Sequence, residues 1–203
     1  MVSDFSDLPE TYGTADASHI ISGSLQLGSS IDTESFAQPS LLADGDGDDE
    51  DGVSRVSTEQ WEPNQEVSLN VTVSGGTGRL VGWFDWNNDG QFSATESVDF
   101  GSLSGSSQVT LTVGSDYVTG TPLSTRFRLF EELAVPSSIE DAFQGGSIGG
   151  EIEDYVWQFT PTAVTLRNAT ADSAQTTPWA IFWVISFALL SLTGVVLRRR
   201  SHH

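Results

Sequence analysis

The segment from residue 85 to residue 96, DWNNDGQFSATE, carries oxygen-bearing side chains at regular spacing. It fits the pattern D-x-[DN]-x-[DN]-G-x5-E of calcium-binding loops. In such a loop alternate side chains point inward and a glycine at the sixth position permits a sharp turn, and hard oxygen ligands suit calcium. The predicted ligands are Asp85, Asn87, Asp89, the backbone carbonyl of Gln91, and Glu96 as a bidentate carboxylate, with Ser93 contributing through a water. The alternative is a plain hairpin turn, since Asn-Asp-Gly favours turns by itself.

A second acidic cluster lies at residues 44–52, DGDGDDEDG. Neighbouring carboxylates about 4 Å apart repel by about 1 kcal/mol per pair even in water, so the unligated segment should stay extended. A divalent ion would reverse that repulsion, and the alternating glycines would let the backbone bend around it. The predicted ligands are Asp44, Asp46, Asp48, Asp49, Glu50 and Asp51. The alternative is a solvated acidic loop.

A third cluster begins the last predicted strand, GEIEDYVWQF. Side chains alternate across a strand, so Glu151 and Glu153 would face one side and Asp154 the other. We expect Glu151 and Glu153 to reach a shared ion, with Asp154 as a further candidate ligand.

Composition excludes several kinds of chemistry. The chain has 203 residues, 28 acidic and 8 basic side chains and a net charge of −20, and all of its basic residues are arginine. It has no cysteine, and a single histidine, His19, precedes the C-terminal His202 and His203. Disulfides, thiol nucleophiles, lysine chemistry and multi-histidine metal sites are therefore excluded or disfavoured. Nucleic acid is a poor partner for so negative a surface.

Five short runs read as strands that position these acids: 67–73, 80–86, 109–113, 125–130 and 155–159. They are β-branched or aromatic and are bounded by Gly, Ser, Asn and Asp. We predict an all-β fold, an antiparallel β-sandwich, for residues 1–159. In the run TRFRLF, Arg126 and Arg128 share one face, where solvent contact or pairing with neighbouring acids is expected.

The C-terminal part has a different composition. Residues 160–178 are rich in Thr and Ala and predict a flexible stalk. Residues 179–197 carry no charge over the length of a membrane-spanning helix, with Trp179 and Trp183 near one end. The basic tail 198–203 follows and begins with Arg198, Arg199 and Arg200. The positive-inside rule puts this tail in the cytoplasm and the β domain outside the cell, as a single-pass membrane protein.

The first residues, MVSDFSDLPETYGT, lack the basic and apolar regions of a signal peptide. We therefore expect the chain to be the C-terminal piece of a larger exported protein.

Several motifs together resemble the GEVED domain of bacterial extracellular proteins. The string GGEIEDYVWQF resembles the signature that names the family. The opening DFSDLPETYGT, His19 with the stretch LGSSIDTE, the run ADGDGDDEDGV and the element WFDWNNDG follow that family's motifs in order, over residues 4–159. Ser6, Leu8 and Ile152 depart from its pattern. The resemblance implies a non-catalytic β-sandwich module of secreted or surface-attached proteins, and its Asp-rich motifs suggest calcium.

The C-terminal layout is similar to bacterial sorting signals, which implies a sorting enzyme as a partner; a simple stop-transfer anchor is the alternative.

Two classes of function follow from these observations. The first is a calcium-stabilised, non-catalytic module for display, spacing or adhesion, with a surface protein or glycan as its partner. The second is a carbohydrate-binding or glycoside-hydrolysing domain, which needs two carboxylates at a defined separation and aromatic platforms such as Trp61. Crowded acids in Gly-rich runs suit cation chelation better than an isolated catalytic pocket, so we expect no enzyme.

Overall fold

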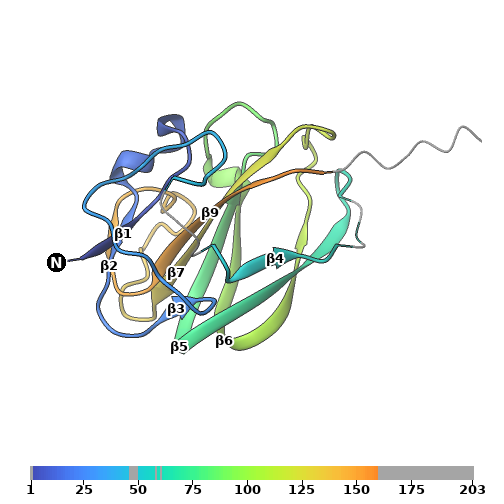
Figure 1. Ribbon diagram of the computed structural model, residues 1–203. Coiled ribbons are helices and arrows are strands. Elements are labelled where there is room, and N and C mark those ends of the chain that lie inside the picture. The colour runs from blue at the N-terminus through green and yellow to red at the C-terminus, as the bar shows by residue number, and fades with distance from the viewer. Residues whose placement is uncertain (1, 46–49, 58, 60, 160–203) are drawn as a thin grey trace, which may run out of the picture. The chain divides into compact units, whose positions relative to one another are not determined.

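Alternating apolar residues build one long central strand, β5 (Glu66–Phe84). The computed structural model describes residues 2–45, 50–57, 59 and 61–159 (Figure 1). The predicted stalk, membrane helix and basic tail lie outside the described residues, and so do Asp46, Asp48 and Asp49. The predicted anchor residues Trp179, Trp183, Arg198, Arg199 and Arg200 lie outside them as well. Within the described part of the chain, no helix is long and apolar enough to span a membrane.

The described residues form strands and short 3₁₀ turns, which confirms the all-β prediction. The remaining strands are β1 (Ser3–Phe5), β2 (Ser18–Ile20), β3 (Gln26–Leu27), β4 (Val53–Arg55), β6 (Ser97–Thr112), β7 (Leu123–Glu131), β8 (Gly146–Ile148) and β9 (Glu151–Trp157). The 3₁₀ turns are η1 (Glu10–Tyr12), η2 (Thr14–Asp16) and η3 (Ala94–Glu96).

Strand β5 organises a six-stranded sheet. It pairs with β6 along one side, and on its other side with β4, with β3 and then with β7, beyond which lies β9. All of these pairs are antiparallel, and Figure 1 shows β6 following β5 along its length. A smaller sheet joins β1, β2 and β8, and its β2–β8 pair is parallel, unlike the antiparallel pairing that we expected.

The predicted strand 67–73 and residues 80–84 of the predicted strand 80–86 are parts of the single strand β5, and Asp85 and Trp86 lie beyond its end. The register shifts between Val73 and Gly78, so the intervening residues are accommodated within the strand instead of ending it. Glycine is required at position 75 within this register shift. Its φ is 78°, and a Cβ there would lie 1.6 Å from the carbonyl oxygen of Ser24. The sequence missed most of β6, residues 97–108, because its many Ser and Gly residues leave few β-branched or aromatic positions.

The sheet is buried on both faces where β5 and β7 meet. One face packs Leu80, Phe84 and Phe127 into the larger apolar cluster, while the other packs Val81 and Trp83 into a second cluster under the N-terminal segment. Trp61 is only 5% exposed and contacts the rings of neighbouring aromatic residues. It is therefore a core residue, not an open platform for sugar stacking.

The core assignment predicts the outcome of a matched pair of substitutions. Leu69 is fully buried in the larger cluster, whereas Leu133 is fully exposed. Leu69→Ala should lower the free energy of unfolding by about 2–5 kcal/mol, through lost burial and the cavity left behind. Leu133→Ala should leave it nearly unchanged, and urea unfolding of both variants checks this. Equal midpoints for the two variants would contradict the assignment.

Candidate functional site

The 85–96 loop follows the end of β5, ends with η3 and curls around the side chain of Asp85. Asp85 Oδ1 accepts a hydrogen bond from the backbone N–H of Asp89 at 3.0 Å, and Oδ2 accepts one from Gly90 at 3.0 Å. Asn88 and Gly90 have φ values of 55° and 82°, so the backbone turns through the left-handed region twice. The first predicted ligand is thus held, 2% exposed, at the centre of the turn.

The next two predicted ligands, Asn87 and Asp89, also accept hydrogen bonds from backbone N–H groups of the loop. Asn87 Oδ1 accepts from the N–H of Asp89 at 2.8 Å, and Asp89 Oδ1 accepts from the N–H of Gln91 at 3.0 Å. Asn87 also donates from Nδ2 to Asp89 Oδ2 at 3.0 Å. The side chains of Asn87 and Asp89 are exposed. Both therefore remain open to solvent and to a solvent cation.

Glu96, the last predicted ligand of the loop, is turned back onto it and buried. Its Oε1 accepts from the N–H of Trp86 at 3.1 Å, and its Oε2 accepts from the N–H and hydroxyl of Ser93, both at 2.9 Å. Ser93 and Glu96 thereby form a capping box at η3. Burial raises the pKa of Glu96, and the charges of Asp85 and Asp89 raise it further. The negative charges of Asp85 and Asp89 therefore act on the buried Glu96 carboxylate.

The donor set of the loop fits a hard cation, because every predicted ligand atom is an oxygen. In the described conformation these oxygens accept hydrogen bonds from the loop's own N–H groups. Among the residues that the structure describes, no three His, Cys, Asp or Glu side chains are grouped so as to hold a metal ion. A carboxylate oxygen can accept more than one contact, so the hydrogen bonds do not exhaust its capacity.

Two members of the second predicted cluster, Asp44 and Asp51, accept hydrogen bonds from different loops. Asp44 accepts from the hydroxyl of Ser40 at 2.7 Å, whereas Asp51 accepts from the N–H of Ser29 at 2.9 Å. Glu50 is partly buried. The three remaining members of this cluster are those outside the described residues.

The third cluster divides between the two faces of β9, as the alternation predicted. Glu151 accepts a hydrogen bond from the N–H of Leu27 on one face. On the same face Glu153 accepts from the N–H groups of Asp51 and Gly52, at 3.1 and 2.8 Å. The structure therefore joins Glu153 to the second cluster, a contact that no spacing in the sequence indicated. Burial raises the pKa of Glu153 to about 8, and the nearby charge of Asp51 adds to the increase.

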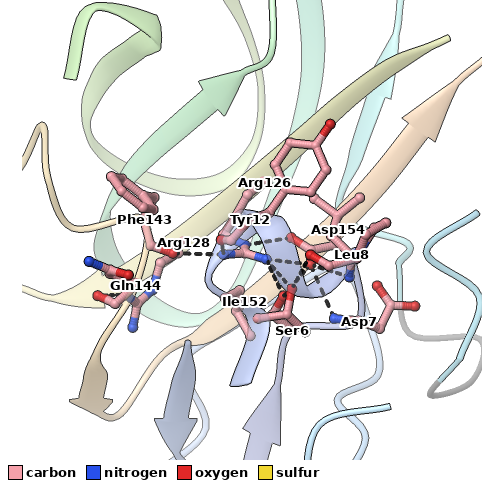
Figure 2. Close-up of polar contacts among 12 residues, drawn as sticks. Ser6, Asp7, Leu8, Tyr12, Arg126, Arg128, Phe143, Gln144, Ile152 and Asp154 are labelled. Carbon is pink, nitrogen blue, oxygen red and sulfur yellow. Dashed lines mark hydrogen bonds and ion pairs between the residues drawn. The ribbon is translucent and has the colours of Figure 1, made fainter. Parts of the chain in front are cut away.

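Asp154 lies on the opposite face of β9 and pairs with Arg126 of β7 (Figure 2). Arg126 Nε donates to Asp154 Oδ1 at 2.8 Å, and Nη2 donates to Oδ2 at 3.0 Å. Oδ2 also accepts from the hydroxyl of Ser6 and from the N–H groups of Asp7 and Leu8. This carboxylate therefore ties the N-terminal segment to the sheet.

The remaining donors of Arg126 also hold segments that are distant in sequence. Nη1 donates to the carbonyl oxygens of Tyr12 and Phe143, both at 2.8 Å, and Nη2 donates to the hydroxyls of Ser6 and Thr14. Arg126 is fully buried. Of the two roles expected from the sequence, pairing with an acid is confirmed, and solvent contact is wrong for this residue.

Arg128 is also buried, but its guanidinium donates mainly to backbone carbonyls. Nε donates to His19 Nε2 at 3.0 Å. The two Nη atoms donate to the carbonyl oxygens of Ala142, Gln144, Ser18 and Gly145. Burial lowers the pKa of Arg128 to about 9, with a smaller contribution from the charge of Arg126. Solvent contact is therefore wrong for Arg128 as well.

The 85–96 loop is connected to this arginine network. Tyr12 donates its hydroxyl to Asp85 Oδ2 at 2.6 Å, while its carbonyl oxygen accepts from Arg126. Phe92 of the loop packs on the ring of Tyr12 with centroids 4.8 Å apart, and the Arg126 guanidinium lies 5.4 Å from the Phe92 centroid. The loop therefore directly contacts residues that hold the N-terminal segment.

The comparison with known families agrees with part of the resemblance drawn from the sequence. The model of the GEVED domain family matches residues 79–158, which include the 85–96 loop, both buried arginines and Asp154. No curated protein matches the chain. No solved structure matches it either.

The Arg126–Asp154 pair predicts a large loss of stability when only one partner is changed. Asp154→Asn leaves a buried guanidinium without a counter-charge, and breaking such pairs costs about 3–5 kcal/mol. The matched control is Asp99→Asn, because Asp99 pairs with Arg79 at the surface, where side chains are 38% and 33% exposed. Urea unfolding should show a strongly lowered midpoint for Asp154→Asn and a nearly unchanged one for Asp99→Asn. Similar midpoints would contradict the structural role of Asp154.

The buried His19 predicts a loss of stability in mild acid. Its Nδ1 lies 2.8 Å from the carbonyl oxygen of Gly149 and its Nε2 accepts from Arg128, so the ring is neutral in the fold. Burial lowers its pKa, and the Arg128 charge lowers it further. The unfolded chain binds a proton below about pH 6.5, and the folded chain does not. The unfolding free energy should therefore fall by up to about 1.4 kcal/mol per pH unit below that point.

His19→Gln supplies the control, because an amide can make both hydrogen bonds without titrating. The difference in unfolding free energy between the wild-type chain and this variant should shrink between pH 7 and pH 5. Parallel pH profiles for the two proteins would show that His19 does not contribute to acid sensitivity.

Proposed function

We propose that the chain is a non-catalytic, calcium-stabilised β-sandwich module of the bacterial cell surface. It serves display, spacing or adhesion as the membrane-anchored C-terminal part of a larger exported protein. The observation that carries the proposal is the 85–96 loop, in which the side-chain oxygens of Asp85, Asn87 and Asp89 bend onto one turn of backbone. The match to the GEVED family over residues 79–158 supports the kind of module.

Calcium would act on the fold through the contacts of this loop. Asp85, Asn87, Asp89, the carbonyl of Gln91 and Glu96 would hold the ion. The ion would supply positive charge beside the Glu96 carboxylate. At present the negative charges of Asp85 and Asp89 act on that carboxylate and raise its pKa. Because Tyr12 and Phe92 join the loop to Arg126, a loop stiffened by calcium would also hold the N-terminal segment more firmly.

The remaining parts of the proposal rest on the sequence. Segment 179–197 would anchor the chain in the membrane, with residues before it outside and Arg198–Arg200 in the cytoplasm. A ligand that binds only the folded state stabilises it by mass action, by about 2.7 kcal/mol at one hundred times its Kd. Extracellular calcium modules have Kd values of about 10⁻⁴–10⁻³ M, which matches the calcium available outside cells.

Calcium titration calorimetry and thermal melting of the full chain test this proposal. We expect calcium to bind and to raise the melting temperature, and a chelator to reverse the increase. Asp89→Asn removes one ligand charge at an exposed position and should weaken calcium binding at least about tenfold, since charge count tunes such loops. Asp116→Asn is the matched control, because Asp116 is exposed outside the acidic clusters and should leave binding unchanged. Identical melting with calcium and with chelator would overturn the calcium role.

A further inference from the structure

Strand β6 forms an open edge of the six-stranded sheet. Over its length it pairs with β5, and within the described residues no other strand pairs with it. In an antiparallel pair, every second residue turns its N–H and C=O away from the neighbouring strand. β6 therefore presents a row of backbone donors and acceptors to solvent, and such a row is a template for a further strand.

The part of this edge from Gly105 to Thr112 lacks the features with which sheet edges are usually protected. Residues 100–115 contain no charged side chain and no proline, although the chain carries 28 acidic residues. From Gly105 to Thr112 the pairing with β5 runs without a register shift, so no bulge interrupts this part of the edge. The opposite edge strand, β9, is covered differently: Asp4 accepts from the N–H of Ile152 at 2.8 Å.

The side chains of this segment would suit a continued sheet. Ser106, Gln108 and Thr110 are exposed on one face, whereas Leu111 is buried and Val109 packs against the larger core cluster on the other. A partner strand that alternates in the same way would extend both faces at once. The β6 strand of a second copy has this alternation because its sequence is the same.

We propose that β6 pairs antiparallel with β6 of a second copy of this chain, around a two-fold axis near Gln108. In this register Gln108 faces its own counterpart, and Ser106 faces Thr110 of the other copy. The pairing places hydroxyl and amide groups opposite one another and opposes no like charges, which are destabilising across strands. The symmetric arrangement satisfies the same backbone groups on both copies.

The charge distribution selects a second copy over other occupants. A basic partner would be attracted to the acidic loops, but residues 100–115 carry no charge that could pair with it. Two copies of a chain with a net charge of −20 repel each other, and this uncharged strip lets them meet without apposed carboxylates. The residual repulsion between the two acidic bodies is screened by salt, so the dimer should strengthen as ionic strength rises.

Disulfide trapping tests the geometry, because the chain has no native cysteine. In the full chain in detergent micelles, Gln108→Cys should form a covalent dimer rapidly under mild oxidation. Leu133→Cys places a fully exposed thiol outside the strip and should form far less dimer. Association through segment 179–197 would affect both variants equally. Equal rates of cross-linking would overturn the proposal.

Sedimentation velocity tests the energetics on the same preparation. Gln108→Glu puts two carboxylates opposite each other across the two-fold axis and should raise the dimer Kd by about fivefold at low salt. Gln65→Glu makes the same chemical change at an exposed position outside β6 and should leave the Kd unchanged. Equal dimer Kd values for these two variants would overturn the proposal. A wild-type chain that stays monomeric at every salt concentration would also overturn it, and would leave the edge to a strand of a different chain.

Discussion

Two buried guanidinium groups on one face of β7 hold the N-terminal segment and residues 142–145 against the sheet. Each has five N–H donors, and a buried donor without an acceptor costs free energy. Arg126 directs its donors to Asp154, two hydroxyls and two carbonyls, and Arg128 directs its own to His19 and four carbonyls. Hydrogen bonds are directional, so these donors fix where the covering segments lie in a way that apolar packing alone would not.

The acidic side chains of β9 and those of the 85–96 loop make different kinds of contact once the fold has formed. Glu151, Glu153 and Asp154 are buried, and each accepts hydrogen bonds from backbone N–H groups of segments far away in sequence. In the 85–96 loop the exposed Asp89 and the neighbouring amide of Asn87 accept hydrogen bonds from backbone N–H groups of the same loop. These three buried carboxylates are thus cross-links between chain segments, while the exposed oxygens of Asn87 and Asp89 are open to solvent cations.

Tyr12 and Phe92 connect the 85–96 loop to the buried arginines. Tyr12 uses its hydroxyl for Asp85 and its carbonyl for Arg126, so one residue joins the turn of the loop to the centre of the network. Trp86 of the same loop enters the larger core cluster on the other side and stacks on Phe84 with centroids 4.8 Å apart. The loop is therefore anchored in both apolar clusters, through Trp86 in one and Phe92 in the other.

The sequence by itself determined the all-β class, the turn at 85–96 and the assignment of Glu151 and Glu153 to one face of β9 and Asp154 to the other. These features are local, because alternation and turn chemistry act over a few residues. Only the tertiary structure decided that Arg126 and Arg128 are buried, that Trp61 is core and that Glu153 meets Asp51. Alternation assigns side chains to a face, but whether that face is covered depends on segments up to about 150 residues away, such as Ser6 beside Asp154. No local pattern records those contacts, since they exist only when the chain has closed.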